Sequence, residues 1–143
     1  YLIFGGLVFI ALNRNYIHLP GNVTPPLAFE HWYRELERPR TRKDQAVLIS
    51  RVLPSSVNSG YSNLHNFIVN TLNGKSINTL YDLDKMLKDM PPDTRHVVFE
   101  SEWQNMPIVL DYKKSLEQQQ SVLKRYGILA GSNLSGMQYK GSQ

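Results

Sequence analysis

The chain has 143 residues, of which 41% are hydrophobic and 20% are charged, so it can form one globular domain with a core of its own. It contains no cysteine, which excludes disulfide bonds, thiolate metal sites and a cysteine nucleophile. The net charge of +4 is mildly basic and does not by itself indicate a nucleic-acid partner.

The chain opens with an apolar segment, Tyr1 to Leu12 (YLIFGGLVFIAL). A membrane-spanning helix needs about 20 apolar residues, and a signal peptide carries a basic leader and a small-residue cleavage site. The segment has neither feature, and its β-branched and aromatic residues favour a strand. We therefore expect a buried strand, interrupted at Gly5-Gly6, and no membrane association. Because no Met precedes Tyr1, we also expect the chain to be part of a longer polypeptide.

Residues 13–45 are predicted to form an insertion that contains one helix. The helix is expected at about residues 27–38, because Thr24 can cap its start and Pro39 stops it. Its apolar side would be a candidate contact between subunits of an oligomer, formed by Leu27, Trp32 and Leu36.

The stretch from Arg34 to Lys43 (RELERPRTRK) is basic: five basic and two acidic residues give a net charge of +3. Basic groups next to aromatic residues such as Trp32 and Tyr33 can bind nucleic acid. Two glutamates dilute the positive field, however. We therefore favour a solvated linker or an acidic contact within an oligomer, with nucleic-acid binding kept as the alternative.

The next elements follow in close order. A strand is predicted from Gln45 to Leu53, and a turn or a single helical turn from Pro54 to Gly60. A second strand is predicted from Asn66 to Leu72. The pair Asn73-Gly74 that follows it is the strongest turn signal in the chain.

A helix is predicted after this turn. Thr79 can cap it, with Asp82 completing a capping box, and Pro91-Pro92 ends it. Apolar residues recur at helical spacing and would form one face of this helix: Leu80, Leu83, Met86, Leu87 and Met90.

The C-terminal part is predicted to contain a hairpin and a final helix. The hairpin strands are His96 to Glu102 and Pro107 to Tyr112, and the helix is Ser115 to Tyr126, closed by Gly127. Residues 128–143 are rich in Gly, Ser and Asn, which indicates a flexible tail. The folded domain is therefore expected to span residues 1–127.

The final helix has a loosely defined apolar side. Four of its residues are expected to pack on the sheets: Leu116, Val122, Leu123 and Tyr126. The run Gln118-Gln119-Gln120 is expected to remain in water.

The order and spacing of these motifs resemble the PDZ domains of Deg/HtrA serine proteases, and most closely the second PDZ domain of eukaryotic Deg proteases. The segments that carry the resemblance are YLIFGGLVFIAL, VLISRVLPSSVNSGY, VNTLNGKSINTLYDL and VVFESEWQNMPIVLD, and together they extend over about residues 1–127. The resemblance implies a mainly β, α+β fold. It would be an antiparallel barrel or sandwich of five to six strands with a groove helix, an insertion helix and a C-terminal helix.

The resemblance also implies a peptide-binding groove. PDZ domains add an extended peptide to a sheet edge beside a helix. The strand side of the groove, including a loop for the peptide carboxylate, would be Gly5, Gly6, Leu7, Val8 and Phe9. The helix side would be Leu80, Leu83 and Leu87.

Val8 departs from the family pattern, because it stands where a second glycine is usual and a β-branched residue resists positive φ. Two interpretations therefore stay open. The groove binds a peptide or a protein C-terminus, or it is closed and the module docks against neighbouring PDZ or protease domains. A homo-oligomer of the full-length protein is expected in both cases.

Catalytic chemistry is not expected in this chain. The resembled proteases use a Ser-His-Asp triad, but none of the serines lies in the Gly-Asn-Ser-Gly-Gly context of their nucleophile. No two histidines have metal-ligand spacing and no phosphate-binding loop occurs. We therefore expect no catalytic residue, no metal and no cofactor here, and assign any peptidase activity to a separate domain.

Overall fold

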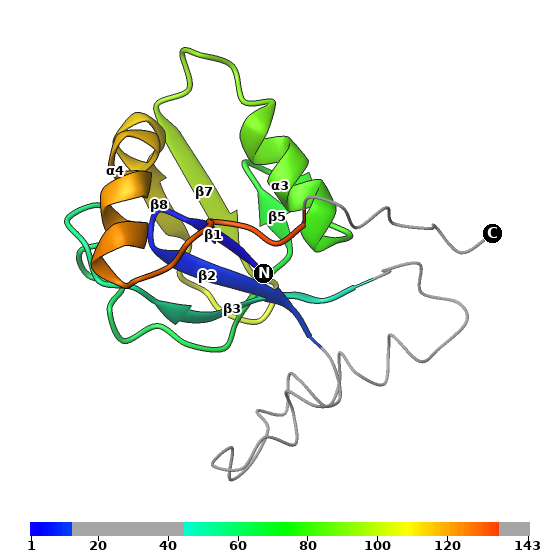
Figure 1. The fold of residues 1–143 in the computed structure, drawn as a ribbon. Helices are drawn as coiled ribbons and strands as arrows, with labels where there is room; N and C mark the ends of the chain where they lie inside the picture. Colours follow the sequence, from blue (N-terminus) through cyan, green and yellow to red (C-terminus); the bar gives the residue numbers. More distant parts are fainter. Residues whose placement is uncertain (13–44, 135–143) are drawn as a thin grey trace, which may run out of the picture.

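Two antiparallel four-stranded sheets form the framework of the domain (Figure 1). The computed structural model describes residues 1–12 and 45–134. The first sheet has the strand order β1-β2-β3-β4, with β1 Leu2–Phe4, β2 Leu7–Ala11, β3 Val47–Val52 and β4 Phe67–Val69. The second has the order β6-β5-β7-β8, with β5 Thr71–Leu72, β6 Lys75–Ser76, β7 His96–Glu100 and β8 Ile108–Asp111.

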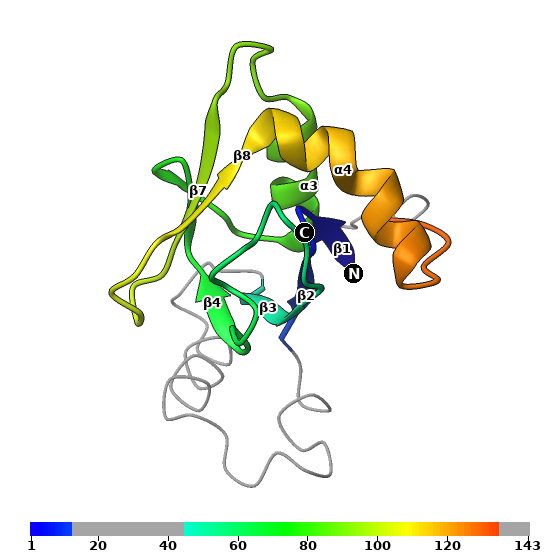
Figure 2. The ribbon, with the colours of Figure 1, turned by 90° about the vertical axis from the view of Figure 1, so that its left-hand side faces the viewer.

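Two helices, α3 (Leu80–Lys88) and α4 (Tyr112–Arg125), accompany the sheets in the described part of the chain. Both lie beside β1, as Figure 1 and the turned view in Figure 2 show. This arrangement confirms the predicted α+β class with antiparallel sheets, a groove helix and a C-terminal helix. Neither described helix is long and apolar enough to cross a membrane.

The predicted insertion helix lies outside the described residues. The same holds for the proposed oligomer contacts Leu27, Trp32 and Leu36 and for the basic stretch from Arg34 to Lys43. These assignments therefore stay predictions.

The opening apolar segment forms a hairpin instead of the single interrupted strand that we expected. Gly5 and Gly6 have φ values of +56° and +78°, as the two central residues of a type I′ turn require. A Cβ atom on Gly5 would lie 2.5 Å from Cδ1 of Leu110, and one on Gly6 would lie 2.5 Å from the carbonyl oxygen of Leu53. Only glycine fits at both positions, so β1 folds back antiparallel onto β2.

The segment predicted as one strand, Asn66 to Leu72, is divided between the two sheets at Asn70. Asn70 is buried, its backbone N–H donates to the Glu100 carbonyl at 2.8 Å, and its carbonyl accepts from the Ile77 N–H at 3.0 Å. Its side-chain Oδ1 accepts a bond of 2.7 Å from the Glu102 N–H. Because all three partners lie outside the first sheet, the chain bends here from β4 into β5.

Two local sequence predictions are confirmed. Asn73 and Gly74 both have positive φ, +49° and +78°, as expected for the hairpin turn between β5 and β6. Thr79 caps α3, and its hydroxyl accepts from the Asp82 N–H at 3.0 Å while Asp82 accepts from the Thr79 N–H at 3.1 Å. The capping box fixes where the helix begins.

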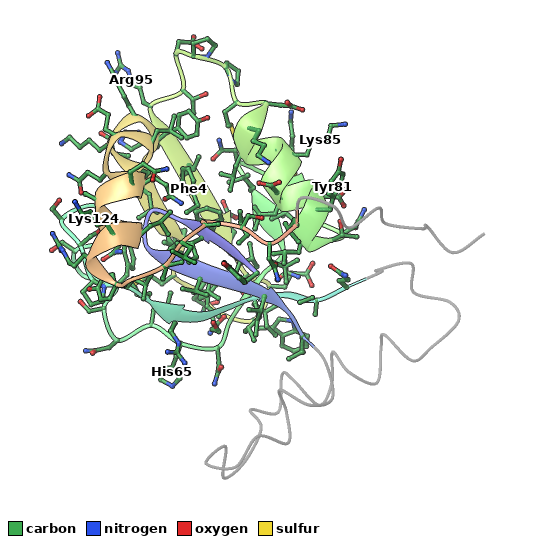
Figure 3. The ribbon with its side chains drawn as sticks, viewed as in Figure 1. Phe4, His65, Tyr81, Lys85, Arg95 and Lys124 are labelled. Atoms are coloured by element: carbon green, nitrogen blue, oxygen red, sulfur yellow. The ribbon has the colours of Figure 1, made fainter. Side chains whose placement is uncertain are left out.

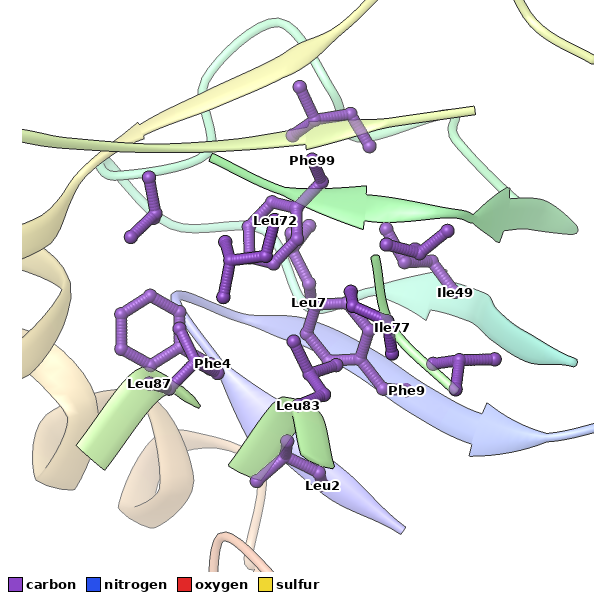
Figure 4. Close-up of a cluster of buried hydrophobic side chains, with 14 of the residues drawn as sticks. Leu2, Phe4, Leu7, Phe9, Ile49, Leu72, Ile77, Leu83, Leu87 and Phe99 are labelled. Carbon is purple, nitrogen blue, oxygen red and sulfur yellow. The ribbon is translucent and has the colours of Figure 1, made fainter. Parts of the chain in front are cut away.

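The core lies between the sheets and α3 (Figure 4). Leu83 is fully buried, and the rings of Phe9 and Phe99 join the two sheets with their centroids 5.2 Å apart. Removing such side chains from water stabilises the fold by about 1.5–3 kcal/mol each. β1 contributes Leu2 and Phe4 to the same core.

The chain reverses direction after α4. Gly127 has φ +68°, its N–H donates to the Lys124 carbonyl at 3.2 Å, and the Ile128 N–H donates to the Leu123 carbonyl at 2.9 Å. These two bonds form a Schellman motif, which ends the helix in a left-handed glycine. Residues 128–134, which the composition predicts as the start of a tail, then cross from α4 towards α3 along β1 (Figure 1).

Candidate functional site: the outer edge of β1

The predicted groove residues of the strand and the helix come together in the structure. Leu7 and Phe9 of β2 are fully buried. Leu80, Leu83 and Leu87 of α3 are buried too, with at most 5% of their surface exposed. All five belong to one core cluster, in which they meet Leu2 and Phe4 of β1. Figure 4 shows the labelled members of this cluster between the two sheets and α3. Leu2 and Phe4 were not among the residues predicted for the groove.

The segment Gly5 to Phe9 has little backbone left for a ligand. β2 pairs with β1 on one side and β3 on the other, so that Val8 lies between Ile3 and Arg51. The Gly5 carbonyl accepts a bond of 2.9 Å from Asn58 Nδ2, and the Gly6 carbonyl accepts one of 2.7 Å from the Leu53 N–H. In this sheet the outer strand beside the helices is therefore β1.

The outer edge of β1 is already hydrogen-bonded within the chain. The Ile3 N–H donates to the Gly131 carbonyl at 2.6 Å, and the Tyr1 carbonyl accepts from the Asn133 N–H at 3.2 Å. The two segments run antiparallel, with Ser132 opposite Leu2. Residues 131–133 thus occupy the place of an added strand.

Gln119 of α4 occupies the other edge-facing backbone group of Ile3, its carbonyl oxygen. Its side-chain Nε2 donates a hydrogen bond of 2.7 Å to the Ile3 carbonyl. Both edge-facing backbone groups of Ile3 therefore have partners from the C-terminal part of the chain. An incoming peptide strand would have to displace these partners before it could pair with β1.

A groove of about 510 Å³ lies between β1, α3 and α4. Phe4 and Tyr112 line it, and their rings stack with centroids 5.9 Å apart. The Tyr112 hydroxyl also donates to the Leu87 carbonyl at 2.8 Å, which ties α4 to α3. Leu116, which the sequence analysis expected to pack, lines the groove with 52% of its surface exposed.

The charges at this groove are paired. Lys88 Nζ lies 2.7 Å from Asp84 Oδ2, one helical turn apart on α3. The lysine is 70% exposed, so the pair contributes little to stability, within about 1 kcal/mol. The groove is thus mainly apolar with one compensated ion pair, and it does not select a ligand of either charge.

A second hollow, of about 690 Å³, lies between α3 and the β5–β6 turn. Two lysines and two aspartates line it, so their charges cancel: Lys75, Lys85, Asp82 and Asp89. Lys85 and the nearby Tyr81 project from the side of α3 that faces away from the core (Figure 3). The mixed lining indicates no particular class of ligand.

The histidines and acidic residues of the described ranges form no metal-binding cluster. No group of three His, Asp or Glu side chains could hold a metal ion there. His65 lies in the loop before β4, where its Nδ1 is 3.0 Å from the Asn63 carbonyl (Figure 3). His96 is exposed at the start of β7. Neither histidine lines the groove beside β1.

Sequence reasoning missed Gln119 and residues 130–133 as parts of this edge. The glutamine run was expected to stay in water, yet Gln119 lies four residues after the buried Ser115 and four before the buried Leu123. That i, i+4 spacing on α4 was the available signal. The composition of residues 130–133 gave no comparable signal.

Comparisons with known proteins complete the description. The PDZ domain family model matches residues 1–133. Over 128 residues, 90% of the chain and 20% of the relative, the sequence is 34% identical to the Arabidopsis thaliana protein named protease Do-like 2, chloroplastic. Over 124 residues, 87% of the chain and 20% of the relative, it is 31% identical to putative protease Do-like 3, mitochondrial, from the same plant. A third Arabidopsis protein, putative protease Do-like 12, mitochondrial, is 27% identical over 128 residues, 90% of the chain and 22% of the relative. The chain thus spans about a fifth of each relative's length.

Proposed function

Because this chain belongs to the PDZ domain family and is homologous to the PDZ regions of Do-like proteases, we propose that it is the interaction module of a Deg/HtrA-type serine endopeptidase. The module binds a peptide or a neighbouring domain, and it thereby regulates substrate binding or assembly of a homo-oligomer. Peptide bonds are cleaved in a separate protease domain. The opening motif YLIFGGLVFIAL supports a position as the second PDZ domain of that protease.

The strand pairing at β1 carries this proposal. A PDZ domain binds by adding a strand to a sheet edge next to a helix, with backbone hydrogen bonds for affinity and side-chain pockets for specificity. Residues 131–133 add to β1 in this manner, and the groove beside α3 and α4 adjoins them. An edge that takes a strand of its own chain has the geometry to take one from a partner.

An assembly module with a closed groove is the second candidate. It is favoured by the hydrogen bonds that residues 131–133 and Gln119 already make to β1. In that case the domain contacts other parts of its oligomer through a different surface. Peptides added in solution would then leave the amide chemical shifts of β1 unchanged.

Amide chemical shifts distinguish the two candidates. The chain would be titrated with an apolar peptide that ends in a free carboxylate, and separately with its amidated twin. Shifts at Tyr1 to Phe4 and along α3 with either peptide are the expected result for a binding module. If millimolar concentrations of both peptides leave these signals unchanged, binding of apolar peptide C-termini is wrong. The mass of the full-length protease with and without this domain then tests the assembly role.

A further inference from the structure

We propose that the outer edge of β1 binds extended internal peptide segments that carry a glycine opposite Ile3. Residues 130–134 are its resident occupant in cis, and Gln119 imposes the glycine requirement. The proposal rests on the proposed function, since it names the class of ligand that the interaction site takes.

The resident segment has the geometry of a bound strand. It runs antiparallel to β1, with Gly131 opposite Ile3 and Asn133 opposite Tyr1. The Tyr1 hydroxyl donates a further bond of 3.0 Å to the Ala130 carbonyl. Leu134, at the end of the segment, is half-buried and packs against the core cluster. Alternating backbone bonds with one apolar side chain in contact with the core are typical of strand addition.

Gln119 determines what can lie opposite Ile3. In a regular hydrogen-bonded antiparallel pair, the two residues exchange two N–H···O bonds. Here Gly131 accepts from the Ile3 N–H, but the Ile3 carbonyl accepts from Gln119 Nε2. A Cβ atom at position 131 would lie 2.8 Å from that Nε2. Any side chain at this position must therefore push the amide of Gln119 away from Ile3.

The closed arrangement is suited to exchange. Gln119 Oε1 is buried without a hydrogen-bond partner in the described structure, which is a free-energy cost of the closed arrangement. The segment itself contributes little burial, because Ala130 and Asn133 are exposed and Leu129 is 103% exposed. A few backbone bonds and one half-buried leucine hold it, so a peptide of the same kind can compete for the edge.

The occupant also indicates how the site treats a peptide carboxylate. The backbone passes through Asn133 to Leu134 and continues beyond it in the sequence, so the edge is filled by an internal segment and not by a chain end. The backbone bonds to residues 131–133 come from Tyr1 and Ile3, and Gly5 and Gly6, the expected carboxylate loop, make none of them. A terminal carboxylate is therefore not required for binding at β1.

A mutant cycle in the whole chain tests the role of Gln119. Hydrogen exchange of the Ile3 amide reports whether residues 130–134 cover β1, and the Phe99 amide in β7 reports the global fold. Gly131→Ala should accelerate Ile3 exchange at least tenfold and leave Phe99 unchanged. Adding Gln119→Ala removes the collision. The exchange rate of the Ile3 amide in the double variant should then lie within about threefold of its rate in the Gln119→Ala single variant. The proposal would be overturned if the Ile3 amide still exchanged fast in the double variant. It would also be overturned if Gly131→Ala did not accelerate Ile3 exchange.

A peptide titration tests the ligand class. The probe is the blocked peptide ILAGSNL, the sequence of residues 128–134, and its twin has Ala in place of the glycine. In the Gly131→Ala chain, the glycine peptide should bind with a Kd at least tenfold below that of its twin. It should also bind this chain more tightly than the unaltered one, and a free carboxylate should change its Kd less than twofold.

The outcomes separate this inference from the proposed function. Equal affinity of the two peptides contradicts the glycine requirement, although the interaction role stands. Binding of only the apolar peptide with a free carboxylate contradicts the internal-segment class and again leaves that role intact. If no peptide of either kind shifts the β1 signals in any variant, peptide binding at this edge is wrong altogether.

Discussion

The side-chain amide of Asn58 donates a hydrogen bond of 2.9 Å to the carbonyl oxygen of Gly5, 53 residues earlier in the chain. The same Nδ2 donates to the Leu53 carbonyl at 2.8 Å, and Oδ1 accepts from the Ser55 N–H at 2.9 Å. Asn58 is only 1% exposed. It therefore ties the β1–β2 turn to the loop after β3 and determines where the outer edge of β1 lies.

We expect Asn58→Ala to lower the free energy of unfolding by about 2–4 kcal/mol, because three hydrogen bonds are lost and buried backbone groups become unpaired. Denaturant unfolding measures this. Asn63→Ala, at an exposed position of the same loop, is the matched control and should change stability by less than about 0.5 kcal/mol. Similar losses in both variants would contradict the assigned role of Asn58.

Gly5→Ala tests the packing of the same turn. The substitution places an L-residue at positive φ and a Cβ atom 2.5 Å from Leu110 Cδ1. Conformational strain and overpacking together should destabilise the domain by about 2–4 kcal/mol. Gly60→Ala isolates the strain, because its φ is +95° and nothing lies within 4 Å of the added Cβ. We expect Gly60→Ala to lower the free energy of unfolding by about 1–2 kcal/mol, measured by denaturant unfolding. An equal loss for Gly5→Ala would mean that the β1–β2 turn can relax around the added Cβ atom.

Local signals in the sequence predicted much of this fold. The Asn73-Gly74 pair and the Thr79–Asp82 capping box depend on neighbouring residues alone, and both form as predicted. The apolar face of α3 was also predictable, since Leu80, Leu83 and Leu87 recur at helical spacing. Such features need no knowledge of distant contacts.

Features that depend on distant contacts were not predictable in the same way. Asn70 divides a predicted strand because groups from other segments satisfy its polar atoms, among them Glu100 and Glu102. The edge of β1 depends on residues more than 110 positions away: Gln119 bonds to Ile3 across 116 positions. Polar residues in a helix and a Gly/Ser-rich segment carry no periodic signal of such pairing. The sequence therefore indicated a groove but not its occupant.

Leu83→Ala should be the more damaging of two substitutions on α3. Leu83 is fully buried among core residues, so the lost burial and the resulting cavity should cost about 2–5 kcal/mol. Tyr81 lies on the outer side of the same helix and is 49% exposed, and Tyr81→Ala should cost less than about 1 kcal/mol. Thermal or denaturant unfolding compares the two. A larger effect of Tyr81→Ala would show that the outer side of α3 is covered in solution.

Thr79→Ala should lower stability by about 0.5–2 kcal/mol, because α3 loses the side-chain acceptor that satisfies its Asp82 N–H. Thr79→Ser retains the hydroxyl and serves as the conservative control, with a change of less than about 0.5 kcal/mol. Denaturant unfolding of both variants provides the comparison. If serine is as damaging as alanine, the buried methyl group of Thr79 matters more than the capping bond.

Gly127→Ala tests whether the end of α4 controls the edge of β1. Gly127 has φ +68° with nothing within 4 Å of an added Cβ, so alanine introduces strain of about 1–2 kcal/mol without a collision. The chain can relieve this strain by opening the Schellman motif, which would withdraw residues 130–134 from β1. Since 1.4 kcal/mol corresponds to a factor of about ten, we expect the Ile3 amide to exchange about five- to thirtyfold faster by local opening. Gly74→Ala is the matched control, because its φ of +78° and open surroundings give similar strain in the distant β5–β6 turn. Equal acceleration of Ile3 in the two variants would mean that global stability, and not the helix end, governs access to this edge.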